Sequence, residues 1–472
     1  MEFLLYNSFN VQGHLFRVYL CANLLYYENS ILSRLCRYFS IYFKEYSVPT
    51  AESFFLLLLS MLVLESADSL RFLYRHFISQ WTEKSLNAFY YVCSYAKVDY
   101  SSFMNTTVKI ALSLIPTSLC SQPLFLCIDD TMVAKYGTKF EDVSKLFDHA
   151  AHQGSSYLHG HCFVSLLLCI PVWKNGKIHY LSVPLGYRMW QKTTSKLSLA
   201  AQMVTQIMPD LTSKRTILLC DTWYAKQEVT ALVDQFPQLD IVCNVRKDTV
   251  LYELPPEPSG KRGRPKKHGK RISLEKDSSL SEEPIDGYYT GVQRVLSNLF
   301  GERKVFAYVT STEKLGGSRR LFLSTITPAT LSLFCAWQEV APLNQTGLDW
   351  MLYVPLFLYR FRWNIEISYY EQKKFWSLER YMLRSRIGIE RMLNLITILY
   401  SAMKLLPYLE KDFLNYQTES VQEFRFYLSK TIRAELIIHS FVTSIENQIK
   451  SSHIRQLLQQ KVLSFFSHTQ KL

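Results

Sequence analysis

The order of apolar and polar residues divides the chain into helical and strand-like parts. Residues 1–118 repeat apolar side chains at helical spacing, which predicts a helical region. The apolar runs then shorten to the length of strands, at 123–128, 162–172, 215–220 and 239–246. A helical pattern at 225–236 separates the last two runs, and strand, helix and strand in this order are typical of an α/β fold.

The following part of the chain is basic and rich in structure breakers. Residues 251–285 combine Pro and Gly with closely spaced Lys, Arg and His, which predicts a linker. At its centre, Arg262-Gly263-Arg264-Pro265 resembles an AT-hook, whose arginines enter the minor groove of A·T-rich DNA. A solvated basic loop and a nuclear-localisation patch are the alternatives. Strand-like pieces return between residues 288 and 326, so we expect a β-rich insertion, and a helical pattern follows it.

Composition and charge indicate a globular protein with a polyanionic partner. Of the 472 residues, 48% are hydrophobic and 20% are charged, which suits two or three folded domains. The 53 Lys and Arg residues exceed the 40 Asp and Glu residues and give a net charge of +13. Ten cysteines without a CxxC pair indicate free thiols in a reducing compartment.

Two apolar stretches are candidates for contact with a membrane, and neither fits one. Residues 53–64 are too short for the span of about 20 residues that crosses a bilayer, so we expect a buried helix there. Residues 1–25 lack a basic start and a small-residue cleavage site, so we expect no signal peptide.

Aspartates directly follow two of the predicted strands. Asp129 and Asp130 end the first strand, and Asp221 ends the third, at positions where open α/β sheets place ligand groups. Successive residues of a strand point to opposite faces, so only one residue of the Asp129-Asp130 pair can face a shared site. Strand alternation alone leaves open which of the two does so.

A third acid, Glu366, lies in a predicted helix between residues 359 and 373. At a helical period of about 100° per residue, Tyr359, Arg362, Glu366 and Lys373 fall on one face. An acid flanked by Arg and Lys suits a site that holds phosphate and metal together. The alternative is an amphipathic surface helix with ordinary ion pairs.

Three acids brought together repel one another unless a cation neutralises them. Hard divalent cations with oxygen ligands do so. We therefore expect Asp129, Asp221 and Glu366 to hold two Mg²⁺ ions, which would activate an attacking oxygen and stabilise a leaving 3′ oxygen. Arg362 and Lys373 would hold the phosphates of the DNA.

With these motifs together, the chain resembles a DDE transposase of a bacterial insertion sequence. Tyr359, Arg362, Glu366 and Lys373 match the Tyr-(2)-Arg-(3)-Glu-(6)-Lys signature of one group, and the sequences after Ile128 and Cys220 resemble its two Asp motifs. The Asp-x-Thr pattern of the first motif favours Asp129 as the metal ligand, with Asp130 in support. The resemblance covers about residues 120–410. It implies an α/β fold with an RNase H-like core that a β-rich insertion interrupts, between helical N- and C-terminal regions.

The resemblance also implies an activity and partners. Mg²⁺, with Mn²⁺ as a substitute, would support nicking at transposon ends and attack of the 3′-OH on target DNA. The partners would be terminal inverted repeats and target DNA, bound by a dimer in the bacterial cytoplasm at the nucleoid, without a membrane. The alternatives are a DNA-binding descendant whose site is unused and an RNase H-like nuclease without strand transfer.

The expected domain organisation follows from these parts. We expect a helical, DNA-binding domain at residues 1–118 and the first part of the core at residues 119–250. The linker with the insertion follows at residues 251–345, the core is completed at residues 346–410, and a helical C-terminal region is expected at residues 411–472.

Some other residues have open interpretations. Lys135 and Arg246 resemble basic positions that flank the site in relatives, or they are surface charges. Trp223 and Tyr224 are expected to be core aromatics behind Asp221 and not base-stacking groups. Four histidines are expected to be loop residues and not zinc ligands, namely His149, His152, His159 and His161. Trp337 and Trp363 are weak candidates for an aromatic side chain on which a base turned out of the DNA duplex would stack.

Overall fold

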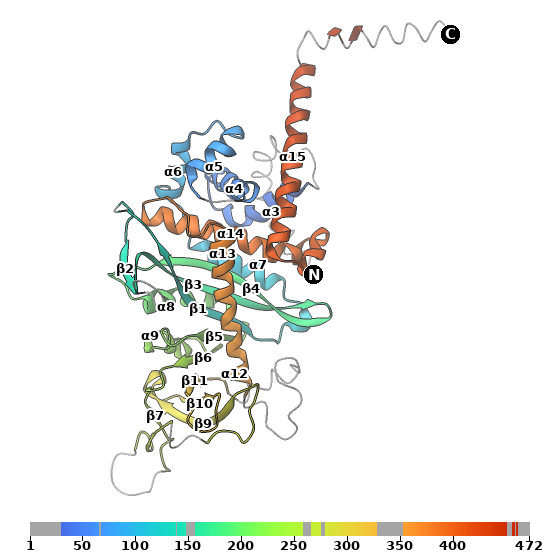
Figure 1. Ribbon diagram of the computed structural model, residues 1–472. Coiled ribbons are helices and arrows are strands. Elements are labelled where there is room, and N and C mark those ends of the chain that lie inside the picture. The colour runs from blue at the N-terminus through green and yellow to red at the C-terminus, as the bar shows by residue number, and fades with distance from the viewer. Residues whose placement is uncertain are drawn as a thin grey trace. The chain divides into compact units, whose positions relative to one another are not determined.

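The computed structural model describes most of the chain and divides it into two compact units (Figure 1). The described residues are 30–65, 68–137, 139–147, 156–257, 266–274, 279–327, 353–450, 456–457 and 459–460. One unit combines residues from both ends of the chain, namely Met1–Ser66, Arg71–Val92 and Ser420–Leu472. The other comprises Ala67–Leu70 and Cys93–Glu419.

The first unit is helical where it is described. Its elements are α3 (Ile31–Phe43), α4 (Val48–Val63), α5 (Leu70–His76), η1 (Ile78–Gln80), α6 (Leu86–Ser94) and α15 (Val421–Lys450). The apolar run seen in the sequence forms most of α4 and is buried, because α15 packs on α3 and α4. Glu435 of α15 accepts hydrogen bonds from the first two backbone N–H groups of α3, at 2.7 and 3.0 Å. A carboxylate at this end of a helix satisfies donors that have no partner within the helix.

The second unit is a mixed α/β structure around one large sheet. Its strands are β1 (Leu124–Ala134), β2 (Ser144–Phe147), β3 (Tyr157–Lys174), β4 (Lys177–Met189), β5 (Thr216–Cys220), β6 (Leu239–Val245), β7 (Leu251–Tyr252), β8 (Arg271–Ile272), β9 (Tyr289–Ser297), β10 (Lys304–Ser311) and β11 (Arg320–Ser324). Among the described residues the strand order is β2-β3-β1-β5-β6-β11-β10-β9-β7-β8, and β4 also pairs with β3.

The strand directions are consistent with an RNase H-like core. Strands β1, β5 and β6 are parallel neighbours, whereas β3 and β4 are antiparallel additions beside β1. Strand β11 pairs antiparallel with β6, so β7–β11 continue the same sheet. Because β5 and β6 are parallel, their C-terminal ends meet at one edge, where Asp221 follows β5.

Strand β4 has no counterpart among the strands that the sequence predicts. Pro184 and Gly186 interrupt its apolar pattern, and the register with β3 shifts between Leu166 and Leu167. A bulge of this kind lets an irregular strand pair with a regular one. The predicted helix at 225–236 is also different, since two single-turn helices replace it, α9 (Gln227–Thr230) and α10 (Leu232–Gln235).

The second unit also contains longer helices and 3₁₀ turns, several of which pack on the sheet (Figure 1). They are α7 (Ser102–Ser113), η2 (Thr117–Leu119), α8 (Lys196–Ile207), η3 (Met208–Leu211), η4 (Asn298–Phe300), α12 (Val354–Leu358), η7 (Tyr359–Arg362), α13 (Trp363–Phe375), α14 (Arg386–Leu409) and η8 (Lys411–Gln417). The consecutive elements α12, η7 and α13 cross the sheet from β6 over β1 and β5 to β3 and β4. Helix α14 is long and apolar enough to cross a membrane, but 83% of its apolar window is buried in the protein, as in a core helix.

Candidate active site

The structure brings Asp129 and Glu366 together around one arginine. Arg362, the last residue of η7, points its Nη1 at Asp129 Oδ2 of β1, 2.8 Å away, and at Glu366 Oε1 of α13, 3.4 Å away. The side chains of Arg362 and Asp129 are only 14% and 13% exposed. A partly buried guanidinium between two carboxylates forms stronger hydrogen bonds than a surface pair does.

The pKa of Asp129 depends on the charges of the other two acids, including Asp221. Burial raises the pKa of Asp129 well above its usual value, and the negative charges of Glu366 and Asp221 raise it further, against the effect of Arg362. Burial also raises the pKa of Asp221, while N–H groups of its own turn and Arg362 lower it. The three acids therefore share one electrostatic environment, in which Arg362 is the nearby cation.

The turn after β5 fixes the position of Asp221. Its Oδ1 accepts hydrogen bonds from the backbone N–H groups of Trp223, at 3.0 Å, and Tyr224, at 3.2 Å. The Tyr224 side chain is fully buried, as expected from the sequence, but Trp223 is 51% exposed. The expectation that Trp223 belongs to the core is therefore wrong, because the turn that buries Tyr224 directs its neighbour outward.

Asp130 faces the opposite side of β1 from Asp129, as strand alternation requires. Its carboxylate accepts hydrogen bonds from Lys196 Nζ at 2.8 Å, Tyr224 Oη at 2.9 Å and Cys162 Sγ at 3.0 Å. The Lys196 ammonium also lies 5.2 Å from the centre of the Trp223 ring. Asp130 thus ties β1 to α8, β3 and the turn that carries Asp221.

Sequence reasoning did not identify Lys196. The available signal is weak, since the Lys196 side chain is one of several basic groups near predicted loops. Ser195, whose hydroxyl accepts a hydrogen bond from the Leu197 N–H, marks the start of α8. Only the fold shows that this helix start lies beside Asp130.

Tyr359 and Lys373 lie at the two ends of the signature segment. The residues from Tyr359 to Arg362 form a 3₁₀ turn and not a continuous α-helix, yet residues three apart in such a turn still share a face. The Tyr359 ring packs on Phe322, and the guanidinium of Arg362 lies 5.8 Å from its centre. Lys373 donates a hydrogen bond to the Met132 carbonyl of β1, at 2.9 Å, which fixes α13 to β1.

Lys135 is buried, so the interpretation as a surface charge is wrong. It is 6% exposed and donates to the carbonyl oxygens of Glu379, at 2.7 Å, and Tyr381, at 2.9 Å. His161 is buried beside it, with Nδ1 2.6 Å from the Tyr381 hydroxyl. Arg246 is an exposed residue, paired with Asp248.

The donor set fits a divalent metal ion in its chemistry. The charges of Glu366 and Asp221 raise the pKa of Asp129, and the three carboxylates are hard oxygen ligands, which Mg²⁺ prefers. In the part of the chain that the structure describes, no three acidic, His or Cys side chains are already arranged to hold a metal ion. Arg362 instead compensates the charge of Asp129 and Glu366.

Several predicted residues lie outside the described part of the chain. They are Arg262 and Arg264 of the AT-hook-like segment, His149, His152 and Trp337. Trp363 is described and is 61% exposed at the start of α13.

The comparisons with known proteins agree with this chemistry. A family model, the DDE superfamily endonuclease, matches residues 78–293. The match supports a DDE-type transposase or nuclease, a class of metal-dependent enzymes that act on DNA. It includes Asp129 and Asp221 and ends before Glu366, so the assignment of the third acid depends on the geometry around Arg362. No curated protein matches the chain.

Proposed function

We propose that the chain is a transposase that cuts DNA at transposon ends and joins the released 3′ ends to target DNA. The observation that supports it most is the Arg362 guanidinium between Asp129 and Glu366, with Asp221 in the same electrostatic environment. The signature from Tyr359 to Lys373 supports an origin in a bacterial insertion sequence.

Asp129, Asp221 and Glu366 would hold two Mg²⁺ ions, with Mn²⁺ as a substitute. When bound, the ions would activate the attacking oxygen and stabilise the leaving 3′ oxygen. Arg362 provides a fork of N–H donors that matches a phosphate group, and it lies beside the acids. Lys373 would bind a phosphate only after leaving the Met132 carbonyl, so we assign it first to the placement of α13.

The further expectations about partners follow from the same proposal. We expect the enzyme to bind terminal inverted repeats and target DNA as a dimer, at the nucleoid of a bacterial cytoplasm. The helical N-terminal region and the basic segment with Arg262 and Arg264 are candidates for additional DNA contacts.

The test replaces acids without changing their size. Asp221→Asn and Glu366→Gln should bind DNA and lose Mg²⁺-dependent cleavage, whereas Glu379→Gln, an exposed acid beyond α13, should cleave normally. Undiminished cleavage by Asp221→Asn would exclude the proposed site. Nicking without strand joining would favour a nuclease, and DNA retention without nicking in Mg²⁺ or Mn²⁺ would favour a DNA-binding descendant.

A further inference from the structure

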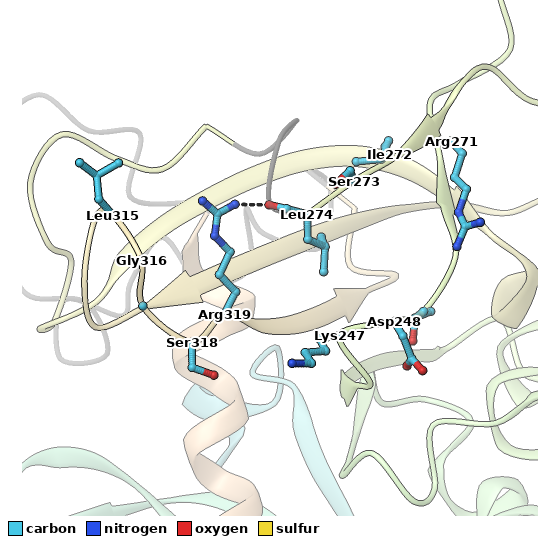
Figure 2. Close-up of a pocket in the computed structure, with 12 residues that line it drawn as sticks. Lys247, Asp248, Arg271, Ile272, Ser273, Leu274, Leu315, Gly316, Ser318 and Arg319 are labelled. Carbon is cyan, nitrogen blue, oxygen red and sulfur yellow. Dashed lines mark hydrogen bonds between the residues drawn. The ribbon is translucent and has the colours of Figure 1, made fainter.

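A large groove lies in the second unit apart from the carboxylates (Figure 2). Its volume is about 1130 Å³, and its walls are residues 247–249 after β6, residues 271–274 from β8 onward, and residues 315–319 before β11. Pockets for small molecules measure roughly 300–1,000 Å³. An open groove of this size suits a segment of a polymer.

The groove is positively charged. Figure 2 shows Lys247, Arg271 and Arg319 on its different walls, with Arg319 bonded to the Leu274 carbonyl. Asp248 is the one acid among the described lining residues, and Arg246 binds it through two hydrogen bonds, at 3.1 and 3.0 Å. Within the described part of the chain, neither Lys247 nor Arg271 has an ion pair. Their charges are therefore available to an anionic ligand.

The other lining groups suit a phosphate backbone better than bases. Ser and Thr hydroxyls and the Gly316-Gly317 backbone line the same groove, and such groups bind phosphate oxygens. The described lining residues include no aromatic side chain, which stacking on bases would require. We propose that this groove binds the sugar-phosphate backbone of DNA, without regard to sequence.

The position of the groove connects it to the carboxylates. Strands β5 and β6 are parallel, with Cys220 opposite Cys243, so Asp221 and Lys247 both follow strand ends at the same edge of the sheet. Asp221 lies opposite Asn244, so one strand spacing and three residues separate Asp221 from Lys247, which amounts to roughly 11 Å. At 3.4 Å per nucleotide this distance corresponds to about three nucleotides. This step rests on the proposed function, because it assumes that DNA is cut at the acids.

The test removes the two unpaired cations of the groove from the full chain. Lys247→Ala/Arg271→Ala is compared with Lys177→Ala/Lys304→Ala, which removes two exposed charges at the opposite ends of the strands. Each protein is titrated without divalent metal into two duplexes of unrelated sequence, about three helical turns long, at several salt concentrations.

Each lost phosphate contact should reduce the steepness of log K against log salt by about 0.9. The groove variant removes two cations, so the slope should become shallower by about 1.8 on both duplexes. Its affinity at 0.1 M salt should fall about 10- to 60-fold. Lys247→Arg/Arg271→Lys should restore the slope, which separates charge from folding.

Three results would overturn the proposal. They are an unchanged slope, an equal loss in the Lys177/Lys304 control, and a loss confined to one of the two duplexes. The binding readout does not depend on cleavage. A chain that binds through the groove but never cuts would therefore refute the proposed function alone.

Discussion

Lys135 offers a sensitive test of the packing behind the candidate site. Its ammonium is enclosed by the carbonyl oxygens of Glu379 and Tyr381 and lies 3.7 Å from the centre of the Tyr381 ring. These residues directly follow α13, the helix that carries Glu366. Replacement by Met keeps the length of the side chain and removes the charge and the donors.

The structure gives both the sign and the size of the effect. Burial lowers the pKa of Lys135 from 10.5 to about 8, and Glu379 only partly opposes this. Between pH 8 and 10.5 the unfolded chain then binds more protons than the folded chain, so the stability contributed by this residue rises with pH. One pKa unit corresponds to about 1.4 kcal/mol, so the upper limit is about 3 kcal/mol. Solvent screening reduces the expected gain to roughly 2 kcal/mol.

The assay is urea unfolding of the wild-type chain and Lys135→Met at pH 7 and pH 10. The free energy of unfolding of the wild type, relative to the variant, should increase by roughly 2 kcal/mol between the two pH values. The comparison cancels titrations that both proteins share. An equal difference at both pH values would refute the idea that Lys135 carries its charge into a buried site.

Two other substitutions probe side chains that join distant segments. Arg391→Met should lower the free energy of unfolding by about 3 kcal/mol, as measured by calorimetry or urea unfolding. Arg391 is only 4% exposed, and its guanidinium donates to the carbonyl oxygens of Cys93, Ala96 and Val98. Asp130→Asn should slow cleavage about 10- to 100-fold with DNA affinity preserved, as expected when the support of a metal ligand is lost, and a normal kcat would refute this role.

The strands could be predicted where the apolar pattern is continuous. The runs at 162–172 and 239–246 lie in β3 and β6, because strands covered on both faces need apolar side chains at successive positions. Strand β4 could not be found in this way, because Pro184 interrupts the pattern and the pairing with β3 is irregular. The extra residue of the bulge, Leu185, lies in β4 itself, between the residues that pair with Leu166 and Leu167 of β3.

The candidate site could be predicted as a set of residue types but not as an arrangement. Strand alternation required the side chains of Asp129 and Asp130 to lie on opposite faces of β1, but it did not show which helix would contact each of them. In the structure Arg362 pairs with Asp129, and Lys196 pairs with Asp130. Arg362 of η7 meets Asp129 on one face of β1, whereas on the other face the bond from Tyr224 to Asp130 ties the Asp221 turn to the strand. The link between the Asp221 turn and β1 therefore does not depend on the contacts that Arg362 makes with Asp129 and Glu366.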